Sequence, residues 1–103
     1  MADRLTRVSP KKLNGSAFVG YFIVPYSELV RVLGEPHSGL SMDGKVKAEW
    51  RFSFRGVLFS VYDYKNPLPV DQVTRWHVGG FTSAACLPVA SFLGVEVVRP
   101  SRP

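Results

Sequence analysis

The chain has few of the residues that build covalent or metal-bound frameworks. It contains 103 residues, a single cysteine, Cys86, and two histidines, His37 and His77. One cysteine excludes an internal disulfide, and three scattered ligands of this kind do not make a structural zinc site. No stretch approaches the roughly 20 apolar residues of a membrane-spanning helix, and the N-terminus lacks the apolar segment of a signal peptide. We therefore expect a cytoplasmic protein with no cofactor, no metal ion and no membrane partner.

The sequence also lacks internal repeats and low-complexity segments. A chain of this length buries about 60–70% of its unfolded surface, which is enough for one core. The 46% content of hydrophobic residues fits a globular protein. We expect one domain over residues 13–98, preceded by a flexible basic arm over residues 1–12 and followed by a tail over residues 99–103.

Acidic residues are fewer than basic ones, with 8 Asp and Glu against 13 Lys and Arg, and the net charge is +5. Five of the basic residues lie in the arm and in the last three residues of the chain, at Arg4, Arg7, Lys11, Lys12 and Arg102. The charge permits an anionic partner such as nucleic acid, a nucleotide or an acidic protein. The arm itself is either a solvated terminus or a segment that grips a polyanion.

The strongest pattern lies in residues 45–65. Apolar and polar residues alternate strictly over residues 45–54, which indicates a strand with one buried face. Residues 57–65 are rich in Val, Phe and Tyr, and Arg55-Gly56 between the two runs fits a two-residue hairpin turn in which Gly56 has positive φ. The turn sets a register whose opposite pairs are Phe54 and Val57, Phe52 and Phe59, Trp50 and Val61, and Ala48 and Asp63.

The remaining segments predict further strands and two short helices. We expect strands at residues 17–24, 74–78 and 95–98 and helices at residues 26–33 and 81–93. Trp76 should be buried on the same sheet face as Trp50, and Pro88 should kink or interrupt the second helix. This order predicts an α+β fold, in which an antiparallel sheet with a central hairpin carries two short helices on one face.

Four motifs together carry a family resemblance. They are L-G-E-P (Leu33 to Pro36), D-G-K-V-K-A-E-W (Asp43 to Trp50), V-Y-D-Y-K (Val61 to Lys65) and W-H-V-G-G (Trp76 to Gly80). Over about residues 21–94 the chain resembles a family of small uncharacterised proteins from viral genomes, bacteriophages included. The loop between the last two motifs is shorter and richer in proline here than it often is in that family, which affects any part of a site carried by the loop. The resemblance implies an accessory protein that binds a host component in the host-cell cytoplasm, and it implies no activity.

The outer face of the predicted sheet carries the residues best suited to binding. They are Lys47, Arg51, Tyr62, Tyr64, Arg75 and His77. Aromatic rings between cations suit base stacking and phosphate contact, and Tyr and Arg are also enriched in protein interfaces. The alternative to a binding role is an ordinary solvated surface, or a surface covered by a second copy of the chain. We expect Arg51, Tyr62 and Tyr64 to lie side by side and exposed.

Other candidate sites have weaker support. Gly79 and Gly80 are either an anion seat before a helix N-terminus or a plain turn. Asp63, on the core side, is either an acceptor for loop amides or a site carboxylate with a raised pKa. An enzyme would use Asp63, Glu49 and His77 as acid and base, but no nucleophile elbow or triad spacing accompanies them. Cys86 is expected to be a small buried hydrophobic residue, and we assign no catalytic residue.

These observations predict a small non-catalytic binding protein, monomeric or homodimeric. It would engage a host protein or a nucleotide-type ligand through the outer face of the sheet. The alternative is a nucleic-acid-binding protein that uses the same face together with the basic termini.

Overall fold

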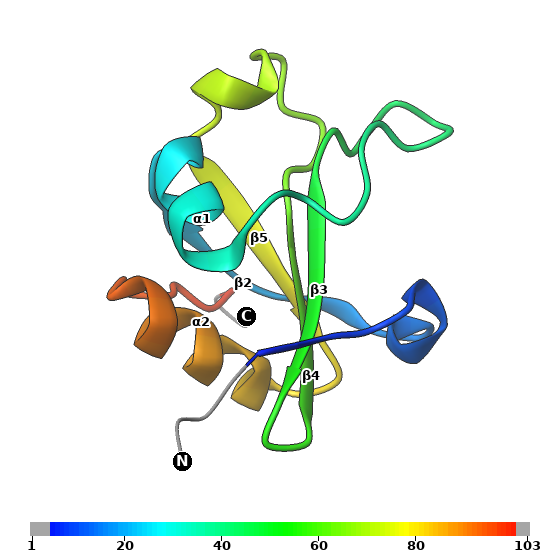
Figure 1. Ribbon diagram of the computed structural model, residues 1–103, viewed down its shortest axis with the longest axis vertical. Helices are drawn as coiled ribbons and strands as arrows, with labels where there is room; N and C mark the ends of the chain where they lie inside the picture. The colour runs from blue at the N-terminus through cyan, green and yellow to red at the C-terminus, as the bar shows by residue number, and fades with distance from the viewer. Residues whose placement is uncertain (1–4, 101–103) are drawn as a thin grey trace.

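The computed structural model describes residues 5–100, and within them five strands form one antiparallel sheet with two helices on one side (Figure 1). The strand order is β1-β3-β4-β5-β2. The strands are β1 (Thr6–Arg7), β2 (Ala17–Ile23), β3 (Glu49–Phe54), β4 (Val57–Tyr62) and β5 (Arg75–Gly80). The helices are α1 (Tyr26–Leu33) and α2 (Cys86–Leu93), and the short 3-10 turns are η1 (Pro10–Leu13), η2 (Val70–Gln72) and η3 (Ser83–Ala85). The predicted α+β fold is confirmed.

The hairpin of β3 and β4 has the predicted register. Phe54 pairs with Val57, and Trp50 pairs with Val61. Both turn residues have positive φ, 52° at Arg55 and 81° at Gly56. Such a turn matches the right-handed twist of the two strands and holds the hairpin closed. The sequence predicted this conformation for Gly56 but not for Arg55.

The core is built around two indoles on the face of the sheet that carries the helices. Trp50 and Trp76 are fully buried, and their rings meet edge to face with centroids 5.6 Å apart. The indole N–H of Trp50 donates to the carbonyl of Gly34 at 2.8 Å, and that of Trp76 donates to the carbonyl of Val24 at 3.1 Å. These carbonyls flank α1, so the two indoles hold both ends of this short helix, which docks through its buried Leu29. The predicted burial of both tryptophans is confirmed.

The N-terminal segment differs from the expected flexible arm. In β1, Thr6 pairs with Ser53 and Arg7 with Phe52, which covers the edge of β3. Farther along, η1 packs against β4 on the side of the sheet opposite the helices, with Leu13 buried (Figure 1). The part of residues 1–12 that the structure describes is therefore organised against the sheet, while residues 1–4 lie outside the described residues, as do residues 101–103 of the predicted tail.

The C-terminal segment follows the prediction with two changes. The helix expected at residues 81–93 begins as η3, where Thr82 Oγ1 accepts the N–H of Ala84 at 3.2 Å, and continues as α2. Pro88 falls in the first turn of α2, where a backbone N–H has no partner within the helix, so its ring is tolerated. The strand expected at residues 95–98 is a single bridge between Val98 and Tyr21. Within residues 5–100, neither helix has the length and apolar character needed to cross a bilayer.

Candidate binding face

Four rings converge on the outer face of the sheet, where strands β2, β4 and β5 lie side by side. His77 on β5 is opposite Tyr62 on β4 and Tyr21 on β2. Its imidazole lies 4.8 Å from the ring of Phe18, 5.5 Å from that of Tyr62 and 6.0 Å from that of Tyr64, measured between centroids. Phe18 is 41% exposed and Tyr64 is 42% exposed. We call this cluster, together with Tyr21 and Arg75, the aromatic face.

Cations border these rings. The guanidinium carbon of Arg75 lies 4.0 Å from the ring centroid of Tyr21, within the distance of a cation–π contact. The ammonium nitrogen of Lys65 lies 5.4 Å from the ring centroid of Tyr64. Because each cation already lies against an aromatic ring, positive charge and π surface are presented together.

Burial favours the neutral forms of His77 and Tyr62 on the aromatic face. Burial lowers the pKa of His77, the nearby Arg75 lowers it further, and Asp63 opposes the shift. Burial raises the pKa of Tyr62, and Glu49 and Tyr64 add to that rise. The environment therefore favours uncharged rings at His77 and Tyr62, and the positive charge near them comes from Arg75 and Lys65.

Arg51 is not part of this surface, and its predicted exposure is wrong. Only 7% of the residue is exposed. Its Nη1 donates to Ser38 Oγ at 2.8 Å and lies 3.5 Å from Glu49 Oε1, and its Nε donates to the carbonyl of Val8 at 3.4 Å. The segment after β1 and the loop before β3 thus fold over Arg51. The expected exposed trio with Tyr62 and Tyr64 therefore does not form.

Gly79 and Gly80, the candidate anion seat, are the last two residues of β5. Both are buried, with β2 and β4 on either side, and η3 begins three residues after Gly80, at Ser83. A Cβ atom on Gly79 would lie 2.5 Å from Ser60 Oγ and 3.2 Å from the ring of Tyr62. A Cβ atom on Gly80 would lie 2.3 Å from the Cβ of Ala85. The bare backbone at Gly79 is what allows the Tyr62 ring to lie across the aromatic face.

Asp63 closes the end of the hairpin. It is fully buried, and its Oδ1 accepts the backbone N–H groups of Lys47 at 2.7 Å and Ala48 at 3.0 Å. Its Oδ2 lies 3.6 Å from the ammonium of Lys47, which also donates to the carbonyl of Asn66. The sequence interpretation in which Asp63 accepts loop amides matches this arrangement, and Lys47 serves it as a counter-ion.

The acid and base of the enzyme hypothesis do not meet. Tyr62 lies between Glu49 and His77 in the sheet, because it pairs with both of them. Two strand spacings, about 10 Å, separate the outer residues of such a row. Burial raises the pKa of Glu49, against the lowering effect of Arg51. Within residues 5–100, no group of three or more His, Cys, Asp and Glu side chains could hold a metal ion.

The aromatic face includes residues that the sequence did not indicate. A β-bulge between Phe18 and Gly20 shifts the register of β2 against β5. Strict alternation would place Phe18 on the face of Phe22, in the core, whereas the bulge places it opposite Gly79 and beside His77. The glycine at position 20 was the available signal, since glycine within a strand often marks a bulge.

No protein-family model, curated protein or solved structure matches this chain. The resemblance to small viral proteins therefore stays a prediction, and the aromatic face is interpreted from its own geometry.

Proposed function

We propose that this chain is a small non-catalytic binding protein whose aromatic face takes a nucleotide-type ligand. The observation that carries the proposal is the convergence of Phe18, Tyr62 and Tyr64 on a neutral His77, beside cations that already lie against rings. Nucleobases stack on aromatic side chains, and each stack contributes about 1–3 kcal/mol. Arg75 and Lys65 supply the charge that phosphate oxygens require.

The two most exposed rings flank the imidazole and give the ligand its platform. Phe18 comes from β2 and Tyr64 follows β4, so a base stacked over His77 would touch side chains from three neighbouring segments of the sheet. The sheet backbone holds Phe18, Tyr62 and His77 in place, which lowers the entropy lost on binding. In the viral setting that the family resemblance suggests, the ligand would come from the host cell.

A longer nucleic acid is the second candidate, and η1 favours it. Lys11 and Lys12 are exposed on this turn, which lies on the same side of the sheet as the aromatic face (Figure 1). A single strand stacked on the rings could reach these lysines with its phosphates. Each additional phosphate contact would steepen the salt dependence of the affinity.

The test is a calorimetric titration of the protein with mononucleotides and with a short single-stranded oligonucleotide. Phe18→Ala and Tyr64→Ala should each weaken binding by about 5- to 100-fold, because each removes one stacking surface. Arg75→Ala should weaken binding of the phosphorylated ligand and leave a nucleoside nearly unaffected. Phe81→Ala is the matched control, since Phe81 is also an exposed phenylalanine and lies outside the aromatic face.

The two ligands discriminate between the candidates. For a nucleic-acid ligand, the logarithm of the oligonucleotide affinity should fall linearly with the logarithm of the salt concentration, with a slope of about 0.7 per phosphate contact. The affinity should also fall in a Lys11→Ala, Lys12→Ala double variant. A mononucleotide affinity that is the same in wild type and in this double variant favours the nucleotide. Absence of binding to both ligands, or unchanged affinity in a folded Phe18→Ala, Tyr64→Ala variant, contradicts the proposal.

A further inference from the structure

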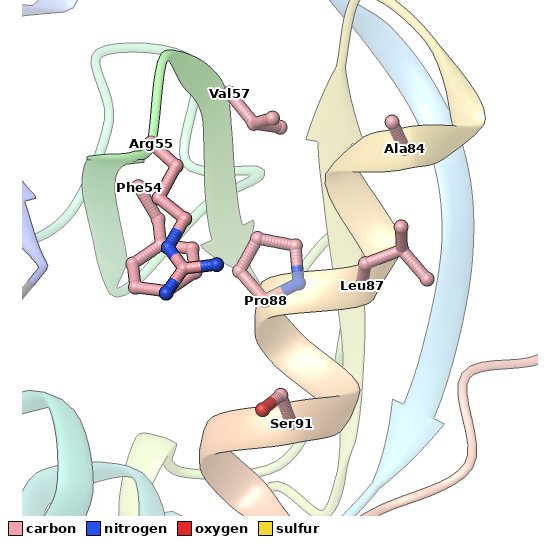
Figure 2. Close-up of a pocket in the computed structure, with 7 residues that line it drawn as sticks. All are labelled: Phe54, Arg55, Val57, Ala84, Leu87, Pro88 and Ser91. Atoms are coloured by element: carbon pink, nitrogen blue, oxygen red, sulfur yellow. The ribbon is translucent and has the colours of Figure 1, made fainter. Parts of the chain in front are cut away.

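A second surface lies on the opposite side of the sheet, between the turn of the hairpin and α2. A cavity of about 320 Å³ opens there, and Figure 2 shows the side chains that surround it. The hairpin supplies Phe54, Arg55 and Val57, and the helical segment supplies Ala84, Leu87, Pro88 and Ser91. We call this cavity the α2 groove. Its floor is well supported, because the ring of Phe54 meets that of Phe92 edge to face at 5.0 Å.

The α2 groove is the middle of a wider apolar surface. Leu87 is 70% exposed and also lines a neighbouring hollow of about 270 Å³ with Ala90 and Val97. On the other side, Val57 also lines a hollow of about 220 Å³ with Leu58 and the exposed Phe81. Leu87 thus stands as a ridge between two depressions. Large contiguous exposed apolar surfaces are rare on monomeric proteins, and they typically mark interaction sites.

Charge indicates the kind of partner. The residues that line the three depressions include two cations, Arg55 and Arg99, and no carboxylate. The guanidinium of Arg55 lies over the ring of Phe54, with its carbon 5.3 Å from the ring centroid, at the rim of the α2 groove. A second copy of this chain, with its net charge of +5, would bring positive charge to this rim. A partner that carries carboxylates complements it.

We propose that the α2 groove docks an acidic amphipathic helix of a partner protein. Apolar side chains four residues apart on such a helix would enter the two depressions on either side of Leu87, as ridges pack into grooves between helices. Asp or Glu side chains at the edges of its apolar stripe would face Arg55 and Arg99. This surface and the aromatic face lie on opposite sides of the sheet, so the inference is independent of the proposed nucleotide function.

The experiment selects binders for the intact chain from a displayed library of helical peptides. The library fixes apolar residues at i, i+4 and i+7 and varies all other positions over acidic, basic and neutral residues. Selected peptides should be enriched in Asp and Glu. Their affinity for Leu87→Ser should fall about tenfold or more, because the central apolar contact is lost. Arg55→Asp should weaken binding several-fold and reduce its salt dependence, and aspartate suits the positive φ of this turn position.

The matched control is Leu40→Ser, since Leu40 is 72% exposed and lies away from the α2 groove. It should leave peptide affinity unchanged, as should Phe18→Ala with Tyr64→Ala on the aromatic face. The proposal is overturned if the library yields no binder, if the binders show no acidic bias, or if Leu87→Ser binds them as wild type does. A concentration-dependent dimer that Leu87→Ser dissociates, measured by light scattering, would also overturn it, because the occupant would then be a second copy.

Discussion

The guanidinium of Arg51 joins three segments that are far apart in the chain. It contacts Val8 after β1, Ser38 in the loop before β3 and Glu49 on its own strand. The backbone N–H of Arg51 donates to His37 Nδ1 at 2.9 Å, which ties the same loop to the sheet a second time. At the residue scale, this side chain therefore stabilises the fold and takes no direct part in the aromatic face.

Replacing Arg51 tests that assignment. Arg51→Ala should lower the free energy of unfolding by about 2–4 kcal/mol, because it removes buried charge-assisted hydrogen bonds and leaves their acceptors without a donor. Arg75→Ala is the matched control, since Arg75 is exposed, and it should stay within about 0.5 kcal/mol of wild type. Urea denaturation measures both. Equal midpoints for the two variants would show that the contacts of Arg51 contribute nothing to stability.

At the scale of elements, the sequence predicts best what is encoded locally. The alternation in residues 45–54 and the Arg55-Gly56 turn set the register of β3 and β4, and this register places Tyr62 on the outer face. The position of His77 follows from the same alternation in β5. These signals need only neighbouring residues, and four of the six residues of the aromatic face, Tyr62, Tyr64, Arg75 and His77, could be predicted from them.

Elements that depend on distant contacts could not be predicted. Thr6–Arg7 has no strand periodicity, and it pairs only because β3 has an open edge. Gly20 indicates a possible bulge in β2, but the outward direction of Phe18 could not be predicted, because residues 17–24 are all apolar or glycine and give no contrast between faces. The cover over Arg51 comes from the loop at residues 35–48, whose composition shows only that it is a loop.

The hairpin turn allows a backbone effect to be isolated. Gly56 has φ of 81°, and a Cβ atom placed there would meet no atom within 4 Å. Gly56→Val should therefore lower the free energy of unfolding by about 1–2 kcal/mol through backbone strain alone. Gly39 is the control, because its surroundings are equally open and its φ is not positive. In thermal unfolding, the melting temperature of Gly56→Val should be lower than that of Gly39→Val. Equal melting temperatures would count against strain in this turn.

At the scale of the whole molecule, the sheet separates two surfaces of different chemistry. One side presents neutral rings bordered by cations, and the other presents apolar depressions beside α2. The fully buried core between them, with its paired indoles, keeps the two surfaces at a fixed spacing. With one proposed ligand on each surface, the molecule would hold a nucleotide-type ligand and a protein helix at the same time.

His37 makes a pH-dependent contribution to the stability of the whole molecule. Its pKa is lowered from 6.5 to about 4, first by burial and then by the charges of Arg7 and Arg51. Its Nδ1 accepts the backbone N–H of Arg51, and protonation would end that hydrogen bond. Between these pH values the unfolded chain binds a proton that the folded chain does not, so stability falls as the pH is lowered from about 6.5 to about 4. Above this window His37 contributes no pH dependence, and below it the loss is complete.

The expected loss across this window is about 1–2 kcal/mol, reduced from the full linkage value because the imidazole is partly exposed. His37→Asn supplies an acceptor that does not titrate, while the carboxylates and His77 contribute equally in both proteins. The free energy of unfolding of wild type minus that of the variant, measured by urea denaturation at several pH values, should therefore isolate the contribution of His37. The difference should be constant above pH 6.5 and should change steadily below it, to the disadvantage of wild type. Parallel curves between pH 4 and pH 7 would show that His37 is protonated in the folded protein as easily as in the unfolded chain.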